Sequence, residues 1–170
     1  MAKKKTNYMS YLPLLAALLG VVALVMLFVP AIAIKDSDTT YTGLQAAFGY
    51  TENVAIIGDV VHLNFSFMNL LPYILVLVGI VACVMGYKGN KLAMFVGFVC
   101  FVVAAVFFFL SVSFCVPNEG LEDLISGIGG LFGEEASVKD SLTLGAGAIV
   151  AGVCSGVAAL SIAASSVLKK

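Results

Sequence analysis

Apolar residues fall into four long runs that are separated by short polar segments. None of the runs contains Asp, Glu, Lys, Arg or His, and they cover residues 11–34, 68–87, 92–115 and 142–168. A helix rises about 1.5 Å per residue, so roughly 20 residues cross a hydrocarbon layer of about 30 Å. The pattern therefore predicts four transmembrane helices, because a helix of a soluble core would be shorter and carry a polar face.

The first run also has features of a cleaved signal peptide. Lysines at residues 3–5 precede it, and Ala31-Ile32-Ala33 resembles a cleavage site. The run is longer than the apolar part of a typical signal peptide, and Pro13 and Pro30 lie near its ends, where a spanning helix tolerates proline. We expect a transmembrane helix here, with cleavage as the alternative.

Charge is segregated between the segments that link the runs. All ten acidic residues lie in two links, residues 35–67 and 116–141. Seven of the lysines lie outside these links: Lys3, Lys4, Lys5, Lys88, Lys91, Lys169 and Lys170. Lysine-rich segments of multi-pass proteins face the cytoplasm. The pattern predicts cytoplasmic termini and two external loops, within a single domain that covers residues 1–170.

The first external loop carries strand signals. Residues 61–67 alternate apolar and polar side chains, which is typical of a half-buried strand. A β-branched run at residues 54–57 precedes them, and Gly58-Asp59 in between is a two-residue hairpin signal. Residues 44–50 alternate as well. We expect a small external sheet of about three strands. An irregular loop with a helical turn around residues 43–48 is the alternative.

The second external loop has apolar residues at helical spacing. Asn118 is a candidate N-cap, and Glu122 and Asp123 fall between the apolar positions, which predicts a short amphipathic helix. Its apolar side either packs on the external sheet or binds a partner. The candidate partner surface consists of Leu121, Leu124, Ile128 and Phe132.

The fourth run combines a cap signal with small residues. Ser137 and Asp140 form a capping-box pattern, which predicts that the helix starts near Val138. Small residues let helix backbones approach closely. They recur here at three- and four-residue spacing: Gly145, Ala148, Gly152, Gly156, Ala159 and Ala163. This face either packs against the other spans of the same chain or mediates self-association or partner binding.

Composition narrows the possible functions. The chain is 61% hydrophobic and 11% charged, whereas soluble domains carry about 25% charged residues. This argues against a soluble enzyme, a disordered chain and a nucleic-acid-binding protein. The spans lack the ionisable groups that proton relays and intramembrane metal sites need. His62 is the single histidine, and the cysteines form no C-x-x-C motif. We therefore expect no enzymatic activity, no cofactor and no metal.

The first external loop contains Gly43-Leu44 followed by Gln45, and it holds neither tryptophan nor cysteine. With four spans and two unequal external loops, the chain resembles the claudin-like tetraspan plan in architecture only. That family carries Gly-Leu-Trp and a cysteine pair in this loop, so no junction-sealing or pore-lining role carries over. Residues 41–50 and 65–73 resemble uncharacterised small four-helix bacterial membrane proteins, a resemblance that implies no known activity.

The sequence thus predicts an all-α protein of the cell membrane, a four-helix transmembrane bundle capped by a small extracellular β-sheet and a short helix. The favoured function is that of a non-enzymatic scaffold, accessory subunit or self-assembling component. It would contact the lipid bilayer and either copies of itself or another membrane protein, and no nucleic acid. The alternatives are a small channel or transporter with an acidic external mouth, and a lipid-binding membrane protein.

Overall fold

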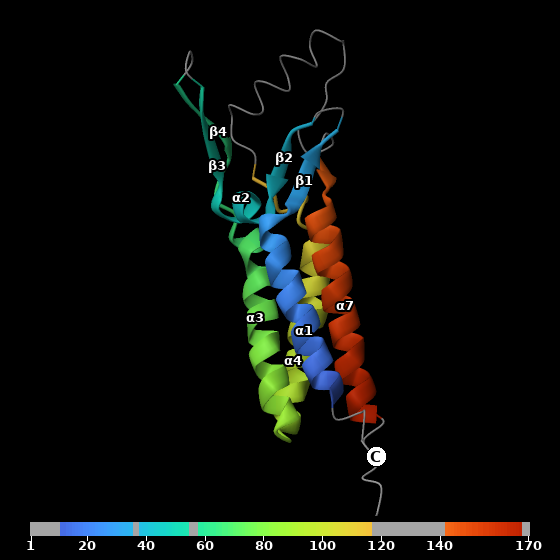
Figure 1. Cartoon of the computed structure of the whole chain (residues 1–170). Coiled ribbons are helices and arrows are strands. Elements are labelled where there is room, and N and C mark those ends of the chain that lie inside the picture. Colours follow the sequence, from blue (N-terminus) through green and yellow to red (C-terminus); the bar gives the residue numbers. More distant parts are fainter. Residues whose placement is uncertain (1–10, 36–37, 55–57, 117–141, 168–170) are drawn as a thin grey trace, which may run out of the picture.

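In the part of the chain that the structure describes, four long helices lie side by side and strands cover one end of them (Figure 1). The structure is a computed structural model that describes residues 11–35, 38–54, 58–116 and 142–167. The start of α1 and the end of α7 lie at the end opposite to the strands. The four helices are α1 (Leu12–Val25), α3 (Phe67–Tyr87), α4 (Lys91–Phe109) and α7 (Ala146–Val167).

Three of the described helices are long and apolar enough to cross a membrane, namely Phe67–Tyr87, Lys91–Phe109 and Ala146–Ser166. The span predicted over residues 68–87 is confirmed to within one residue at its start. The span predicted over residues 92–115 ends six residues early, at Phe109, where a turn follows. The apolar helix Leu12–Phe28 is shorter than these three. The structure therefore supports three of the four predicted spans and does not confirm the first.

Pro30 explains why the first helix is shorter than predicted. After α1, a 3-10 turn, η2 (Met26–Phe28), leads to Val29, which has extended dihedral angles of φ −98° and ψ 149°. A residue that precedes proline is driven to such angles, and proline itself has no N–H to continue a helix. The prediction of a helix through Ile34 is therefore wrong, because Pro30–Ile34 forms strand β1.

The fourth helix also begins later than predicted. Leu142–Leu144 forms strand β5, which pairs antiparallel with β1 through Ile32↔Leu144 and Ile34↔Leu142. The backbone N–H of Gly145 then donates to the carbonyl oxygen of Ala31 at 2.7 Å, and α7 starts at the next residue. The predicted start near Val138 is wrong, because the strand pairing with β1 satisfies the backbone groups of residues 142–144. The predicted capping pair itself lies outside the described residues.

Strand β2 (Thr40–Thr42) lies on the other side of β1, so the sheet order is β2-β1-β5. Residues 43–48 form helix α2 (Gly43–Phe48), so the alternation that predicted a strand there was misleading and the helical alternative is correct. A capping box starts this helix. The Thr42 N–H donates to Gln45 Oε1 at 2.9 Å, and the Gln45 N–H donates to Thr42 Oγ1 at 3.3 Å.

The hairpin predicted in the first loop is confirmed, but the position of its turn is not. Strand β3 (Tyr50–Val54) pairs antiparallel with β4 (Gly58–Leu63), and Gly58 already pairs with Val54. Gly58 and Asp59 are therefore strand residues and not the turn. The strand ends at Leu63, before Phe67, because Ser66 accepts a hydrogen bond from the Asn69 N–H and caps α3. In Figure 1 this hairpin stands apart from the sheet that contains β1.

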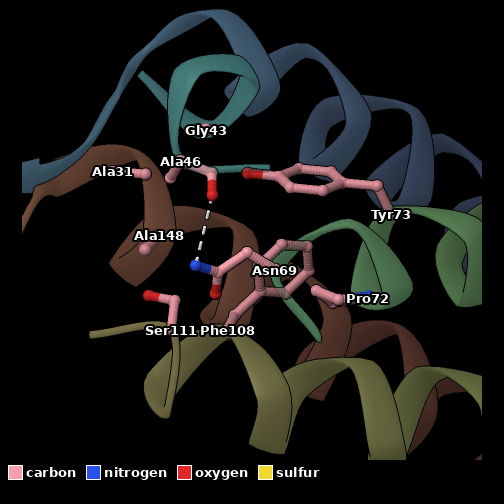
Figure 2. Close-up of a pocket in the computed structure, with 9 residues that line it drawn as sticks. All are labelled: Ala31, Gly43, Ala46, Asn69, Pro72, Tyr73, Phe108, Ser111 and Ala148. Carbon is pink, nitrogen blue, oxygen red and sulfur yellow. Dashed lines mark hydrogen bonds between the residues drawn. The ribbon is translucent and has the colours of Figure 1, made fainter. Parts of the chain in front are cut away.

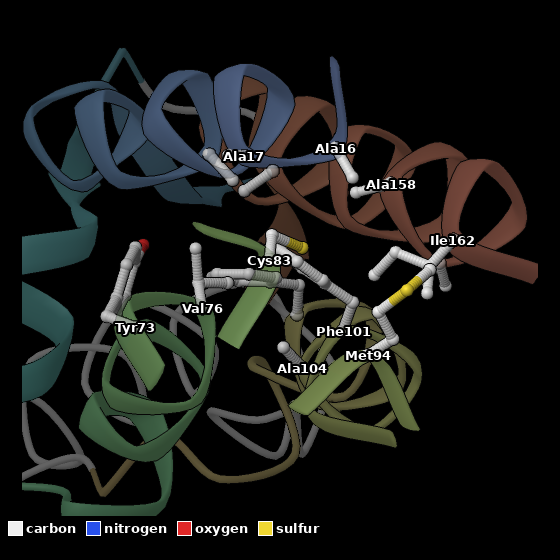
Figure 3. Packing of buried hydrophobic residues seen from close by; sticks show 14 residues of the cluster. Ala16, Ala17, Tyr73, Val76, Cys83, Met94, Phe101, Ala104, Ala158 and Ile162 are labelled. Carbon is white, nitrogen blue, oxygen red and sulfur yellow. The ribbon is translucent and has the colours of Figure 1, made fainter. Parts of the chain in front are cut away.

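The core of the bundle is apolar and centres on Phe101 of α4, which is fully buried (Figure 3). Two glycines from neighbouring helices make room for its ring. A Cβ atom on Gly20 of α1 would lie 2.9 Å from the ring, and one on Gly79 of α3 would lie 3.0 Å from it. Small residues thus allow close helix packing, as predicted for the fourth run. Around Phe101 these small residues are glycines of the first two runs.

Candidate functional site

The small residues predicted as an interaction face of α7 lie mostly inside the molecule. Ala148 and Ala159 are buried. A Cβ on Gly145 would lie 2.6 Å from the carbonyl oxygen of Pro30, and one on Gly152 would lie 2.9 Å from the ring of Phe109. These positions pack against other parts of the same chain.

Gly156 and Ala163 of α7 differ from the other small residues because they are only half buried. A Cβ on Gly156 would have no neighbour within 4 Å among the described residues. Gly156 is therefore the small residue of this face with room for an outside partner. The second predicted surface, Leu121, Leu124, Ile128 and Phe132, lies outside the described residues.

A small polar cavity lies where the bundle meets the strands (Figure 2). Its volume is about 10 Å³, the space of about one water molecule. The residues that line it come from β1, α2, α3, α4, α7 and the turn after α4: Ala31, Gly43, Ala46, Asn69, Pro72, Tyr73, Phe108, Ser111 and Ala148. It is the place where β1, α2 and three of the long helices meet.

Hydrogen bonds at this junction connect segments that are far apart in the sequence. The Ser66 hydroxyl donates to the carbonyl oxygen of Phe114 at 2.7 Å, which ties the start of α3 to the turn after α4. The Asn69 side-chain Nδ2 donates to the carbonyl oxygen of Ala46 at 3.4 Å, which ties α3 to α2. The junction therefore holds the end of the bundle together by polar contacts.

Two buried oxygen atoms of the cavity, Asn69 Oδ1 and Ser111 Oγ, have no hydrogen-bond partner among the residues that the structure describes. In Figure 2 the amide of Asn69 and the hydroxyl of Ser111 lie on neighbouring sides of the cavity. A buried polar atom without a partner costs about 1–3 kcal/mol, and a single water between them would serve both. The cavity has the size of a hydration site and not of a substrate pocket.

The chemistry of this junction is limited to amide and hydroxyl groups. The lining residues include no acid, base or thiol. Elsewhere Cys83, Cys100 and Cys115 are buried and Cys154 is half buried, each as a free thiol. Among the described residues, no group of three or more His, Cys, Asp or Glu could hold a metal ion. His62 lies in β4.

A second, larger depression lies at the opposite end of the bundle. It is a groove of about 260 Å³ between the beginning of α4 and the end of α7. Its lining is apolar except at one end, and consists of Lys91, Met94, Phe95, Phe98, Ile162, Ala163 and Ser166. Phe95 of α4 and Ala163 of α7 both line this groove, and their neighbourhood depends on how the two helices dock.

No protein-family model, no curated protein and no solved structure matches this chain. The resemblances found in the sequence therefore stay predictions of architecture. What the chain can do follows from its own contacts: a packed apolar bundle, a polar junction at one end and an apolar groove at the other.

Proposed function

We propose that the protein is a four-span protein of the cell membrane that acts as a non-enzymatic scaffold or accessory subunit. Both termini face the cytoplasm, and the strands form a rigid external cap. The protein works by contact, either with copies of itself or with another membrane protein. Three helices with the length and composition of membrane spans support the membrane part of this proposal.

The helix Leu12–Phe28 is the fourth span. Its 14 α-helical and three 3-10 residues extend about 27 Å, close to the thickness of the hydrocarbon core. It packs against α3 and α7 and runs beside them through the same layer (Figure 1). Since its neighbours cross the bilayer, a helix that contacts both of them over this length crosses it too.

The distribution of charge supports the orientation. Lys88 and Lys91 lie at the end of the bundle without strands, whereas Asp38, Glu52 and Asp59 lie with the strands. The lysine-rich end faces the cytoplasm by the positive-inside rule. The strands, including the β3–β4 hairpin, are therefore external.

The observation that carries the scaffold function is the continuity between the cap and the spans. Strand β1 follows directly from the first helix, and β5 leads directly into α7, with these two strands paired to each other. The Thr143 hydroxyl adds a bond to the carbonyl oxygen of Ala33 at 3.1 Å. A cap fixed in this way presents its surface in one orientation, which suits a contact function.

The packed interior of the bundle favours a contact function over a channel. The buried cluster that includes Ala16, Val76 and Phe101 occupies the space between the helices and contains no Asp, Glu, Lys, Arg or His among the described residues. A conduction path would have to run between copies of the chain. A channel would also need polar groups along its path, and the polar cavity at the junction holds only about one water.

Cross-linking between copies through the face of α7 around Gly156 tests this proposal. Gly156→Leu should reduce cross-linking between copies in lipid nanodiscs by roughly tenfold, because the added side chain blocks close helix approach. Val157→Leu is the matched control, since Val157 is already exposed on a neighbouring face. Wild-type protein that stays monomeric and binds no partner in its native membrane would contradict the proposal.

A further inference from the structure

The groove between α4 and α7 has the form of a site for a lipid chain. Its floor is made by Met94 and Ile162, which are 7% and 1% exposed and lie next to each other in Figure 3. Phe95, which is 65% exposed, forms an outer wall, and the small side chain of Ala163 leaves the space open. An apolar chain placed here would contact both helices at once.

We propose that this groove binds one acyl chain of an anionic phospholipid from the cytoplasmic leaflet, with the head-group phosphate at Lys91. The inference rests on the proposed orientation, which places the groove at the cytoplasmic face. It goes beyond the scaffold function because it names a ligand, its charge and the leaflet that supplies it.

Charge complementarity selects an anionic lipid. Lys91 is the first residue of α4 and lies at the polar end of the groove. Lys88 lies in the turn that joins α3 to α4. All acidic residues of the chain lie in residues 36–59 and 119–140, the predicted external loops. A phosphate at this end of the bundle would therefore meet lysines and no carboxylate among the described residues. A cationic surface attracts anionic lipids at close range.

Lys91 is the group that contacts the phosphate. The other polar residue of the lining, Ser166, already donates its hydroxyl hydrogen to the carbonyl oxygen of Ile162 at 3.1 Å. The first turn of α4 is capped as well, because Asn90 Oδ1 accepts from the Ala93 N–H at 3.2 Å. The ammonium group of Lys91 makes no hydrogen bond or ion pair with the described residues.

Other occupants of the groove are disfavoured by charge. The two terminal segments of the chain carry only lysines as ionised side chains, at residues 3–5 and 169–170. A second copy docked through the same groove would place its own Lys91 near the first. Both arrangements bring like charges together, whereas an anionic lipid brings the opposite charge together with an apolar chain.

Native mass spectrometry of protein released from nanodiscs tests the proposal. The nanodiscs contain equal amounts of phosphatidylglycerol and phosphatidylcholine with identical acyl chains, so only the head-group charge differs. We expect wild type to retain phosphatidylglycerol in preference to phosphatidylcholine. Lys91→Gln should reduce that preference about fivefold, whereas Lys88→Gln, at an exposed lysine outside the groove lining, should leave most of it.

Two groove variants separate the chain-binding part from the charge. Ala163→Leu fills the groove and should lower retention of both lipids, while Ala164→Leu on the same helix, outside the groove lining, is its control. Equal retention of both lipids by wild type would overturn the proposal, and so would equal losses in Lys91→Gln and Lys88→Gln. Topology measured on the same variants in intact cells separates the failures, since correct orientation without lipid preference rejects the lipid site alone.

Discussion

The two ends of the bundle are built in different ways. At the end with the strands, hydrogen bonds join segments that are far apart in the sequence, such as Ser66 with Phe114 and Gly145 with Ala31. At the other end, α3 and α4 are joined by a short turn at residues 88–90, and α4 and α7 leave an apolar groove between them. One end is held by polar contacts within the chain, and the other carries an open groove.

This difference shows how a bundle without buried charges fixes its shape. Apolar packing holds the helices along their length. In a bilayer, however, lipid tails are as apolar as the helix surfaces, so packing alone does not fix how the helix ends lie relative to one another. Backbone pairing between β1 and β5 supplies that direction at the end with the strands. The described residues show no such pairing at the opposite end, which is where the lipid site is proposed.

The largest effect expected from a single change is at the joint between β1 and α7. Gly145→Val places a Cβ 2.6 Å from the carbonyl oxygen of Pro30 and 2.8 Å from the carbonyl carbon of Ala31, both backbone atoms that cannot yield without moving β1. We expect a loss of about 3 kcal/mol in the free energy of unfolding, measured by denaturant titration in detergent micelles.

The matching change in the turn between α3 and α4 should cost less. Gly89 has φ +103°, but a Cβ there would have nothing within 4 Å. Gly89→Ala therefore adds only backbone strain, about 1 kcal/mol. Equal losses in Gly145→Val and Gly89→Ala would show that the two ends are not built as differently as the contacts indicate.

A smaller effect is expected at the polar junction. Asn69→Ala removes the hydrogen bond from Nδ2 to the carbonyl oxygen of Ala46 and should lower the free energy of unfolding by about 1–2 kcal/mol. Ser111→Ala is the matched change, because it removes a hydroxyl that has no hydrogen-bond partner among the described residues and could bond only to a water in the cavity, so it should cost less than Asn69→Ala. A loss in Ser111→Ala as large as that in Asn69→Ala would contradict the greater weight given to the hydrogen bond from Asn69 to Ala46.

The sequence predicted helix bounds best where an apolar run was not joined to an apolar strand. The span over residues 68–87 agrees with α3 because a long apolar run between Ser66 and the Lys88-Gly89 turn has no competing structure. The helices of the first and fourth runs were predicted too long, because the residues that form β1 and β5 are also apolar. Hydropathy cannot separate a helix end from a buried strand such as β1, and only Pro30 marked the change.

The candidate sites depended on contacts that a pattern along the chain does not contain. Asn69 and Ser111 are visible as polar residues at the external ends of two apolar runs, but their common cavity requires α3 and α4 to pack in register. The glycine positions around Phe101 come from α1 and α3, whereas the sequence drew attention to the small residues of α7. A search for glycines facing a bulky residue across neighbouring spans would have found them.

The accessibility of single cysteines in intact cells tests the four-span arrangement most directly. Lys3→Cys, Asp38→Cys and Lys88→Cys are placed one at a time in a chain whose four native cysteines are replaced by alanine. A membrane-impermeant maleimide should label only Asp38→Cys before permeabilisation, and all three afterwards. Labelling of Lys3→Cys together with Asp38→Cys in intact cells would show that the helix Leu12–Phe28 does not cross the membrane, and would contradict the account.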